Sequence, residues 1–138
     1  MSGSWSHFDH GADIGIEGRG RTLEEAFEEA ALALTAVGVS PDAVPAERQM
    51  GFSCSAPDRE LLLVDWLNEV IYAMSTEGLL FGRYEVRISD DTLTARGWGA
   101  EVARVSERPA VEVKGATMTG LQVRREGRQW IARCVVDV

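Results

Sequence analysis

The chain has 138 residues, of which 45% are hydrophobic, and its formal net charge is −8 at pH 7. This length fits one domain, and the hydrophobic content supports a packed core, which excludes an intrinsically disordered chain. The negative charge argues against strong direct binding to nucleic acid and favours a protein partner or a cation.

The sequence DHGADIGI at residues 9–16 opens the first predicted strand. Alternation along a strand directs Ile14 and Ile16 into the core and leaves Asp13 and Glu17 on the opposite face. A glycine two residues away on each side of Asp13 leaves open space around its carboxylate. We therefore treat Asp13 as a candidate functional group.

Two helices with recognisable N-terminal caps are predicted. Thr22 and Glu25 have the capping-box spacing, and apolar residues at helical spacing continue to Gly38. Asp58 is the expected cap of a second, more apolar helix over about residues 59–76. This second helix is predicted to be central to the fold.

One edge of the second helix is polar. The residues Asp65, Asn68, Glu69 and Tyr72 fall on one helical face. The simplest interpretation of this stripe is a solvated helix edge.

The other segments are predicted to be strands, turns and loops. The pattern predicts a loop at 39–49, strands at 50–54, 83–88 and 93–95, a loop at 97–109, alternation at 111–114, and strands at 121–123 and 130–137. Because apolar residues occupy both sides of the last strand, it is predicted to lie inside a sheet. These elements predict one α+β domain over residues 1–138, with a mostly antiparallel sheet packed with two helices in a strand–helix–strand–strand outline.

Oxygen-bearing groups occur near both ends of the chain. If the ends lie side by side in one sheet, Asp13, Asp137 and the α-carboxylate of Val138 converge. Divalent cations such as calcium or magnesium prefer such oxygen ligands. Aspartates at strand ends are more often simply solvated, so spacing alone leaves both interpretations open.

Other chemistries lack a signature in this sequence. His7 and His10 are three residues apart and would point to opposite faces of a strand, which does not suit a zinc site. The sequence contains no GxSxG elbow, no GxGxxG motif and no P-loop. Lys114 lies beside Glu112, and either an ion pair or a cation offered to a partner would explain it. A metal-dependent hydrolase is the least favoured function, because no general base or nucleophile is evident in the sequence.

The two cysteines, Cys54 and Cys134, match no metal-binding spacing and are predicted to be buried thiols. No apolar run is long enough to cross a bilayer, and the N-terminus has no signal pattern. A cytoplasmic protein without a membrane role is expected.

Four sequence blocks together resemble the archease family. In chain order they are HGADIGI, LLLVDWLNEVIY, EVKGAT and VVDV. The resemblance implies a small α+β protein that serves as a protein cofactor of the RtcB-type tRNA-splicing RNA ligase. Such cofactors promote guanylylation of the ligase and its multiple turnover, and they are not themselves the ligating enzyme.

The resemblance also implies site residues. The metal site of the family matches Asp13, Asp137 and Val138, with calcium as the associated ion and magnesium or manganese as alternatives. The functionally important lysine of the family matches Lys114.

The chain departs from the family pattern at positions near these blocks. Gly11 stands in place of a threonine, Arg108 in place of a histidine, and Met118 and Thr119 in place of an aromatic–histidine pair. These departures leave the predicted ligands in place and affect only predicted partner contacts. The alternative function is a small-molecule-binding or chaperone-like adaptor, which predicts an apolar pocket near Trp98 or Trp130.

Overall fold

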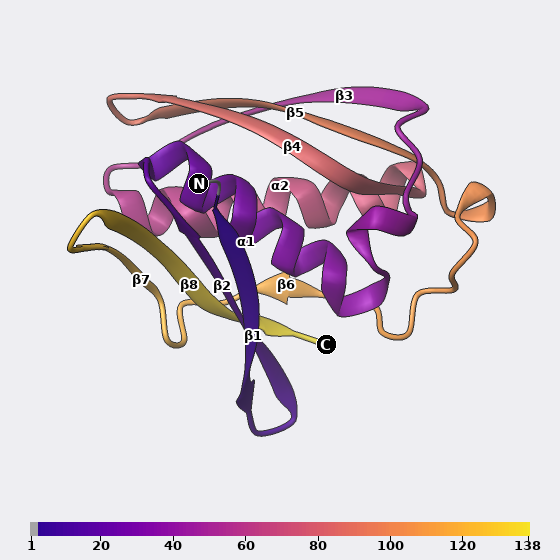
Figure 1. Cartoon of the computed structure of the whole chain (residues 1–138), viewed down its shortest axis with the longest axis horizontal. Helices are drawn as coiled ribbons and strands as arrows, with labels where there is room; N and C mark the ends of the chain where they lie inside the picture. The colour runs from indigo at the N-terminus through magenta and orange to yellow at the C-terminus, as the bar shows by residue number, and fades with distance from the viewer. Residues whose placement is uncertain (1–2) are drawn as a thin grey trace.

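The computed structural model describes residues 3–138 and has two helices between two antiparallel sheets (Figure 1). The helices are α1 (Leu23–Gly38) and α2 (Arg59–Glu77), with short 3-10 helices η1 (Pro41–Ala43) and η2 (Val102–Arg104). The strands are β1 (Ser4–His10), β2 (Asp13–Gly20), β3 (Arg48–Ser55), β4 (Leu79–Ser89), β5 (Thr92–Glu101), β6 (Gly115–Ala116), β7 (Gln122–Glu126) and β8 (Gln129–Asp137). The predicted α+β class is confirmed, although the strands form two sheets and not one.

The sheets have different sizes. The five-stranded sheet has the order β1-β2-β8-β6, and β7 also pairs with β8. The three-stranded sheet has the order β3-β5-β4. Because β8 has partners on both edges, the prediction that the last strand lies inside a sheet is confirmed.

Local capping fixes where both helices begin. The Thr22 hydroxyl accepts a hydrogen bond from the Glu25 N–H at 3.1 Å, and the Glu25 carboxylate accepts one from the Arg21 N–H at 2.9 Å. Asp58 accepts a hydrogen bond from the Leu61 N–H at 2.8 Å. The Glu25 and Leu61 amides belong to first helical turns, where they have no partner within the helix, and Glu25 also binds the amide of the residue before the Thr22 cap. Both predicted caps are confirmed.

Helix α1 lies directly on the five-stranded sheet at Gly18. A Cβ atom added there would lie 2.3 Å from the Ala26 carbonyl oxygen and 2.3 Å from the Ala30 amide nitrogen. Both are backbone atoms of α1, so only a residue without a side chain permits this approach.

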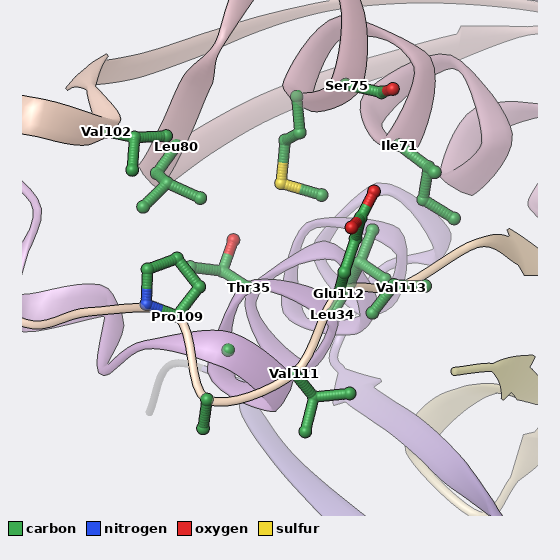
Figure 2. A pocket seen from close by; sticks show the side chains of 13 residues that line it. Leu34, Thr35, Ile71, Ser75, Leu80, Val102, Pro109, Val111, Glu112 and Val113 are labelled. Atoms are coloured by element: carbon green, nitrogen blue, oxygen red, sulfur yellow. The ribbon is translucent and has the colours of Figure 1, made fainter.

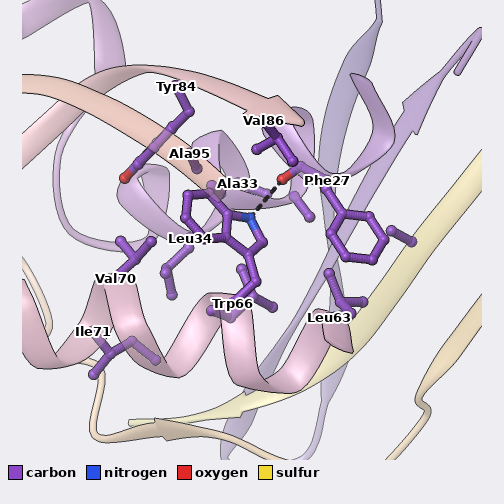
Figure 3. Packing of buried hydrophobic residues seen from close by; sticks show 14 of the residues in the cluster. Phe27, Ala33, Leu34, Leu63, Trp66, Val70, Ile71, Tyr84, Val86 and Ala95 are labelled. Atoms are coloured by element: carbon purple, nitrogen blue, oxygen red, sulfur yellow. Dashed lines mark hydrogen bonds between the residues drawn. The ribbon is translucent and has the colours of Figure 1, made fainter. Parts of the chain in front are cut away.

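The indole of Trp66 is the centre of the core. It is 0% exposed, and its ring meets Phe52 of β3 and Tyr84 of β4 edge to face, with centroid distances of 5.4 and 5.8 Å. Its Nε1–H donates to the Phe27 carbonyl of α1 at 3.1 Å (Figure 3). Trp66 therefore connects both helices with the three-stranded sheet, as expected for the apolar second helix.

Two predicted boundaries in the second half of the chain are wrong. The predicted loop at 97–109 begins later, because β5 continues to Glu101 with pairing to β4. The alternating run at 111–114 forms no strand, and only Gly115 and Ala116 join the sheet. Alternation predicts a strand only where a partner edge is available, and here the chain first contacts β8 at the last residue of the run, Lys114, with strand pairing from Gly115.

The thiols of both cysteines lie at least partly inside the fold, as predicted. Burial raises the pKa of Cys134 to about 12. Burial, together with the nearby carboxylates of Asp65 and Glu69, raises the pKa of Cys54 to about 11.

This environment predicts slow alkylation of the native protein. Relative to a thiol with the pKa of 9.0, Cys54 has about 100-fold less thiolate at pH 8, and the thiolate is the reactive form. Iodoacetamide labelling followed by mass spectrometry should show little modification of the native chain and two modified cysteines after unfolding in guanidinium. Rapid native labelling would contradict the burial of these groups.

Candidate functional site

The β1–β2 hairpin places Asp13 at one end of the five-stranded sheet. Gly11 has a φ of +62°, which lets the chain turn between the paired residues His10 and Asp13. The predicted single opening strand at residues 9–16 is therefore two strands, with the turn inside it. This hairpin projects beyond the rest of the sheet (Figure 1).

Strand β8 brings Asp137 to the same end. β2 and β8 are antiparallel, and their register includes the pair Ile14–Val136. One further step in this register sets Asp13 opposite Asp137, and directly opposed residues point to the same face of a sheet. The predicted approach of the two segments within one sheet is confirmed, and the C-terminus lies beside the hairpin (Figure 1).

Lys114 directly precedes strand β6, on the other side of Asp137. Gly115 pairs with Asp137, and the Lys114 N–H donates to the Asp137 carbonyl oxygen at 2.8 Å. The Ala116 N–H donates to the Asn68 side-chain oxygen at 2.9 Å, which ties β6 to α2. Asn68 is thus a structural hydrogen-bond acceptor. The prediction that it belongs to a solvated helix edge is wrong for this residue.

The side chains at this sheet end are accessible to solvent. Asp137 and Lys114 are exposed, and Asp13 is half-buried. None of the three forms an ion pair within residues 3–138, so the ion pair considered for Lys114 and Glu112 is not formed. We define Asp13, Asp137 and Val138 as the acidic end of the sheet, with Lys114 next to it.

The same sheet face also carries an internal charge network. Glu17 is only 8% exposed, with its carboxylate 2.8 Å from the Arg19 Nε and 3.4 Å from an Arg133 Nη. The Arg133 guanidinium lies over the Phe8 ring at 4.1 Å. The prediction that the Glu17 side chain faces solvent is wrong, because these arginines cover the sheet face on which it lies. The negative charge of Glu17 is therefore balanced by two arginines, whereas the acidic end forms no ion pair within residues 3–138.

The metal-ligand chemistry at the acidic end is limited to oxygen donors. The described residues contain no cluster of three or more His, Cys, Asp or Glu side chains suited to a metal ion. The acidic end has two such side chains, and its third carboxylate is the main-chain group of Val138. This donor set suits a hard cation and does not suit zinc. His7 and His10 lie on opposite faces as predicted, with the His7 ring 2.8 Å from the Ala33 carbonyl oxygen.

A separate cavity of about 470 Å³ lies between α1, α2 and residues 109–113 (Figure 2). Leu34, Ile71 and Leu80 line it with apolar surface, and Glu112 contributes a carboxylate. The pocket at Trp130 has mainly polar and charged residues around it. The apolar pocket therefore lies away from the position predicted for an adaptor.

The sequence and the fold were compared with known proteins. Residues 5–138 match the model of the Archease protein family (MTH1598/TM1083). The chain belongs to the archease family. A protein archease from Pyrococcus furiosus is 36% identical over 140 residues, covering 97% of this chain and 98% of that protein. A protein archease from Methanosarcina barkeri is 31% identical and covers 97% of this chain and 95% of that protein.

Solved structures agree with this membership. The solution structure of Methanobacterium thermoautotrophicum protein 1598 has a TM-score of 0.85 and 34% identity, covering 98% of this archease chain and 99% of that chain. A Thermotoga maritima structure described as an archease and possible chaperone has a TM-score of 0.66 and 21% identity, covering 95% and 94%, and it shows the shared fold. Within residues 3–138 of this archease, neither helix combines the length and the apolarity that a membrane crossing requires.

Proposed function

We propose that this archease activates an RtcB-type tRNA-splicing RNA ligase as a non-enzymatic partner. It promotes guanylylation of the ligase and multiple turnover. Family membership supports the class of protein, and the observation that carries the proposal is the β2–β8 pairing, whose Ile14–Val136 pair directly adjoins Asp13 and Asp137. At this acidic end Asp137 is exposed and Asp13 is half-buried, so a second protein has access to it.

In this proposal Asp13, Asp137 and the carboxylate of Val138 hold a divalent cation. Calcium is the expected ion, with magnesium or manganese as alternatives, because all three ions accept hard oxygen ligands. A bound cation would supply positive charge that offsets the charge of a transferring phosphoryl group. The protein's own residues contribute two aspartate carboxylates at an accessible sheet end.

Lys114 is proposed as a contact to the ligase. Its backbone is held against Asp137, and its side chain is exposed beside the acidic end. A lysine at this position offers a cation to an acidic group of the partner next to the bound metal. This role differs from metal binding, since an ammonium group repels the cation.

A guanylylation assay of the cognate ligase tests the proposal. The ligase is incubated with labelled GTP and a divalent metal, with and without this chain, and covalently labelled ligase is measured over time. We expect several-fold faster labelling and more than one ligation product per ligase when the chain is present. A Lys114→Ala variant is expected to require a higher concentration for the same effect. Identical labelling with and without the chain would refute the activator role.

The apolar cavity supports the second candidate function, a small-molecule-binding adaptor. Its volume of about 470 Å³ lies in the range of ligand pockets. This function predicts that an apolar ligand binds in the presence of a chelator, whereas activation of a ligase through the acidic end requires the metal. Chelation therefore separates the two functions.

A further inference from the structure

The outer face of the three-stranded sheet carries three polar or aromatic cross-strand pairs, which are every second pair of the β4–β5 register. These pairs, which we call the arginine–tryptophan face, are Arg83–Trp98, Glu85–Arg96 and Arg87–Thr94 between β4 and β5. The alternate residues of these strands are buried against the helices, so these six side chains point to solvent. In Figure 1 the three strands form the outermost layer above the helices.

The charge of this face is opposite to that of the whole chain. It has three arginines and one glutamate, whereas the chain has a net charge of −8. The single ion pair, between Arg87 and Glu85, is 3.7 Å long, and the Arg87 side chain is 78% exposed. Within residues 3–138, Arg83 and Arg96 form no ion pair. The acidic composition therefore does not describe this face, where positive charge is available to anions.

A cation–π contact lies at one end of the face. The Arg83 guanidinium is 4.4 Å from the centre of the Trp98 ring, and Trp98 is only partly covered. A guanidinium on an indole is a surface on which a nucleobase can stack, as aromatic and arginine planes do in single-strand binding proteins.

The face also has room for a ligand next to its arginines. A hollow of about 200 Å³ is lined by Glu85, Arg87, Thr94, Ala95 and Arg96. On the adjacent strand, a Cβ added to Gly51 would meet only the Ala95 carbonyl oxygen, at 4.0 Å. Gly51 is paired with Arg96, so a missing side chain leaves open surface beside that guanidinium.

We infer that the arginine–tryptophan face binds an unpaired nucleic-acid strand. One base stacks on the Trp98–Arg83 pair, and the backbone phosphates contact Arg96 and Arg87. The first and last pairs of the face are four residues apart, or about 13 Å along a strand, so stacking and phosphate contacts engage the same short segment. An acidic peptide would use the arginines only, whereas a nucleic acid also uses the partly covered Trp98 ring.

This inference does not depend on the proposed activation of a ligase. The face belongs to the three-stranded sheet, and the acidic end belongs to the five-stranded sheet. Binding at one therefore leaves the other accessible, and the test below uses the chain alone.

Fluorescence anisotropy of a labelled 12-nucleotide single-stranded RNA, titrated with this chain at low salt, tests the inference. Parallel arms use single-stranded DNA of the same sequence, a blunt RNA duplex and poly-glutamate as a competitor. We expect binding to both single strands, weaker binding to the duplex, and little competition by poly-glutamate. Because stacking contributes strongly to such binding, Trp98→Leu should weaken it about tenfold. Arg96→Gln should lower the slope of log affinity against log salt by about 0.7.

Matched controls separate this face from general charge effects. Arg128→Gln removes one positive charge at the β7–β8 turn, and Trp5→Leu removes a tryptophan that is 39% exposed on β1. Both should bind RNA as the unaltered chain does, and circular dichroism checks that every variant is folded. The inference is overturned if the chain binds no single strand, if Trp98→Leu and Trp5→Leu have equal effects, or if poly-glutamate displaces the RNA completely.

Discussion

Replacing Asp13 or Asp137 with asparagine is expected to reduce stimulation of the ligase to the level of the ligase alone. Each substitution keeps the size of the side chain and removes one of the two carboxylates that directly adjoin the Ile14–Val136 pair of β2 and β8. A hard divalent cation loses an anionic ligand, and neutral amide oxygens bind it more weakly. The measurement is ligase guanylylation, together with calcium binding by isothermal titration calorimetry.

The same substitutions should leave the fold intact. In the absence of metal, two like charges opposite each other across a strand pair destabilise a sheet, so removing one should leave the melting temperature unchanged or slightly higher. Asp42→Asn is the matched control, because Asp42 is exposed in η1 and its substitution changes the net charge by the same amount. Full stimulation by either sheet-end variant would remove the carboxylates from the mechanism.

Replacing Trp66 with alanine is expected to lower the free energy of unfolding by about 3–5 kcal/mol. The indole is 0% exposed and packs edge to face against Phe52 and Tyr84. Alanine loses this buried apolar area, leaves a cavity between helix and sheet, and removes the hydrogen bond to the Phe27 carbonyl. This loss is a large part of the stability of an ordinary small domain.

Urea unfolding followed by circular dichroism measures this effect. Tyr72→Ala is the matched control, because Tyr72 is an aromatic residue of the same helix that is 68% exposed, and its loss should change stability by less than about 0.5 kcal/mol. A Trp66→Phe variant should fall between the two, since it keeps an aromatic ring and loses the N–H donor. A change of less than about 1 kcal/mol for Trp66→Ala would show that the core tolerates the cavity, contrary to its packing.

The elements predicted most accurately were those with local causes. Thr22 and Asp58 each cap a helix through an amide three residues away, so the local sequence contains both the donor and the acceptor. The apolar faces of α1 and α2 follow from the same short-range periodicity. The prediction that β8 is an interior strand also came from the sequence, because apolar residues on both faces require cover on both sides.

The errors concern segments whose state depends on distant neighbours. The run at 111–114 alternates like a strand but contacts β8 only at its last residue, Lys114. By contrast, β5 extends to Glu101 because β4 pairs with it up to that residue. Glu17 has the position of an outward residue in its strand, and only the fold brings Arg133, which is 116 residues away, over it. The turn at Gly11 was missed because a strand can also contain a glycine.

The candidate site, too, was predicted in part by the sequence and in part decided by the tertiary structure. The sequence by itself identified Asp13, Asp137 and Lys114 as residues of interest, since carboxylates and a lysine occur in blocks that resemble one family. Only the tertiary structure decided that they are neighbours, because backbone pairing between β2, β8 and β6 joins segments from opposite ends of the chain. The arginine–tryptophan face was likewise invisible in the overall charge, because a sum over all residues does not record which side chains a pair of strands turns to the same side.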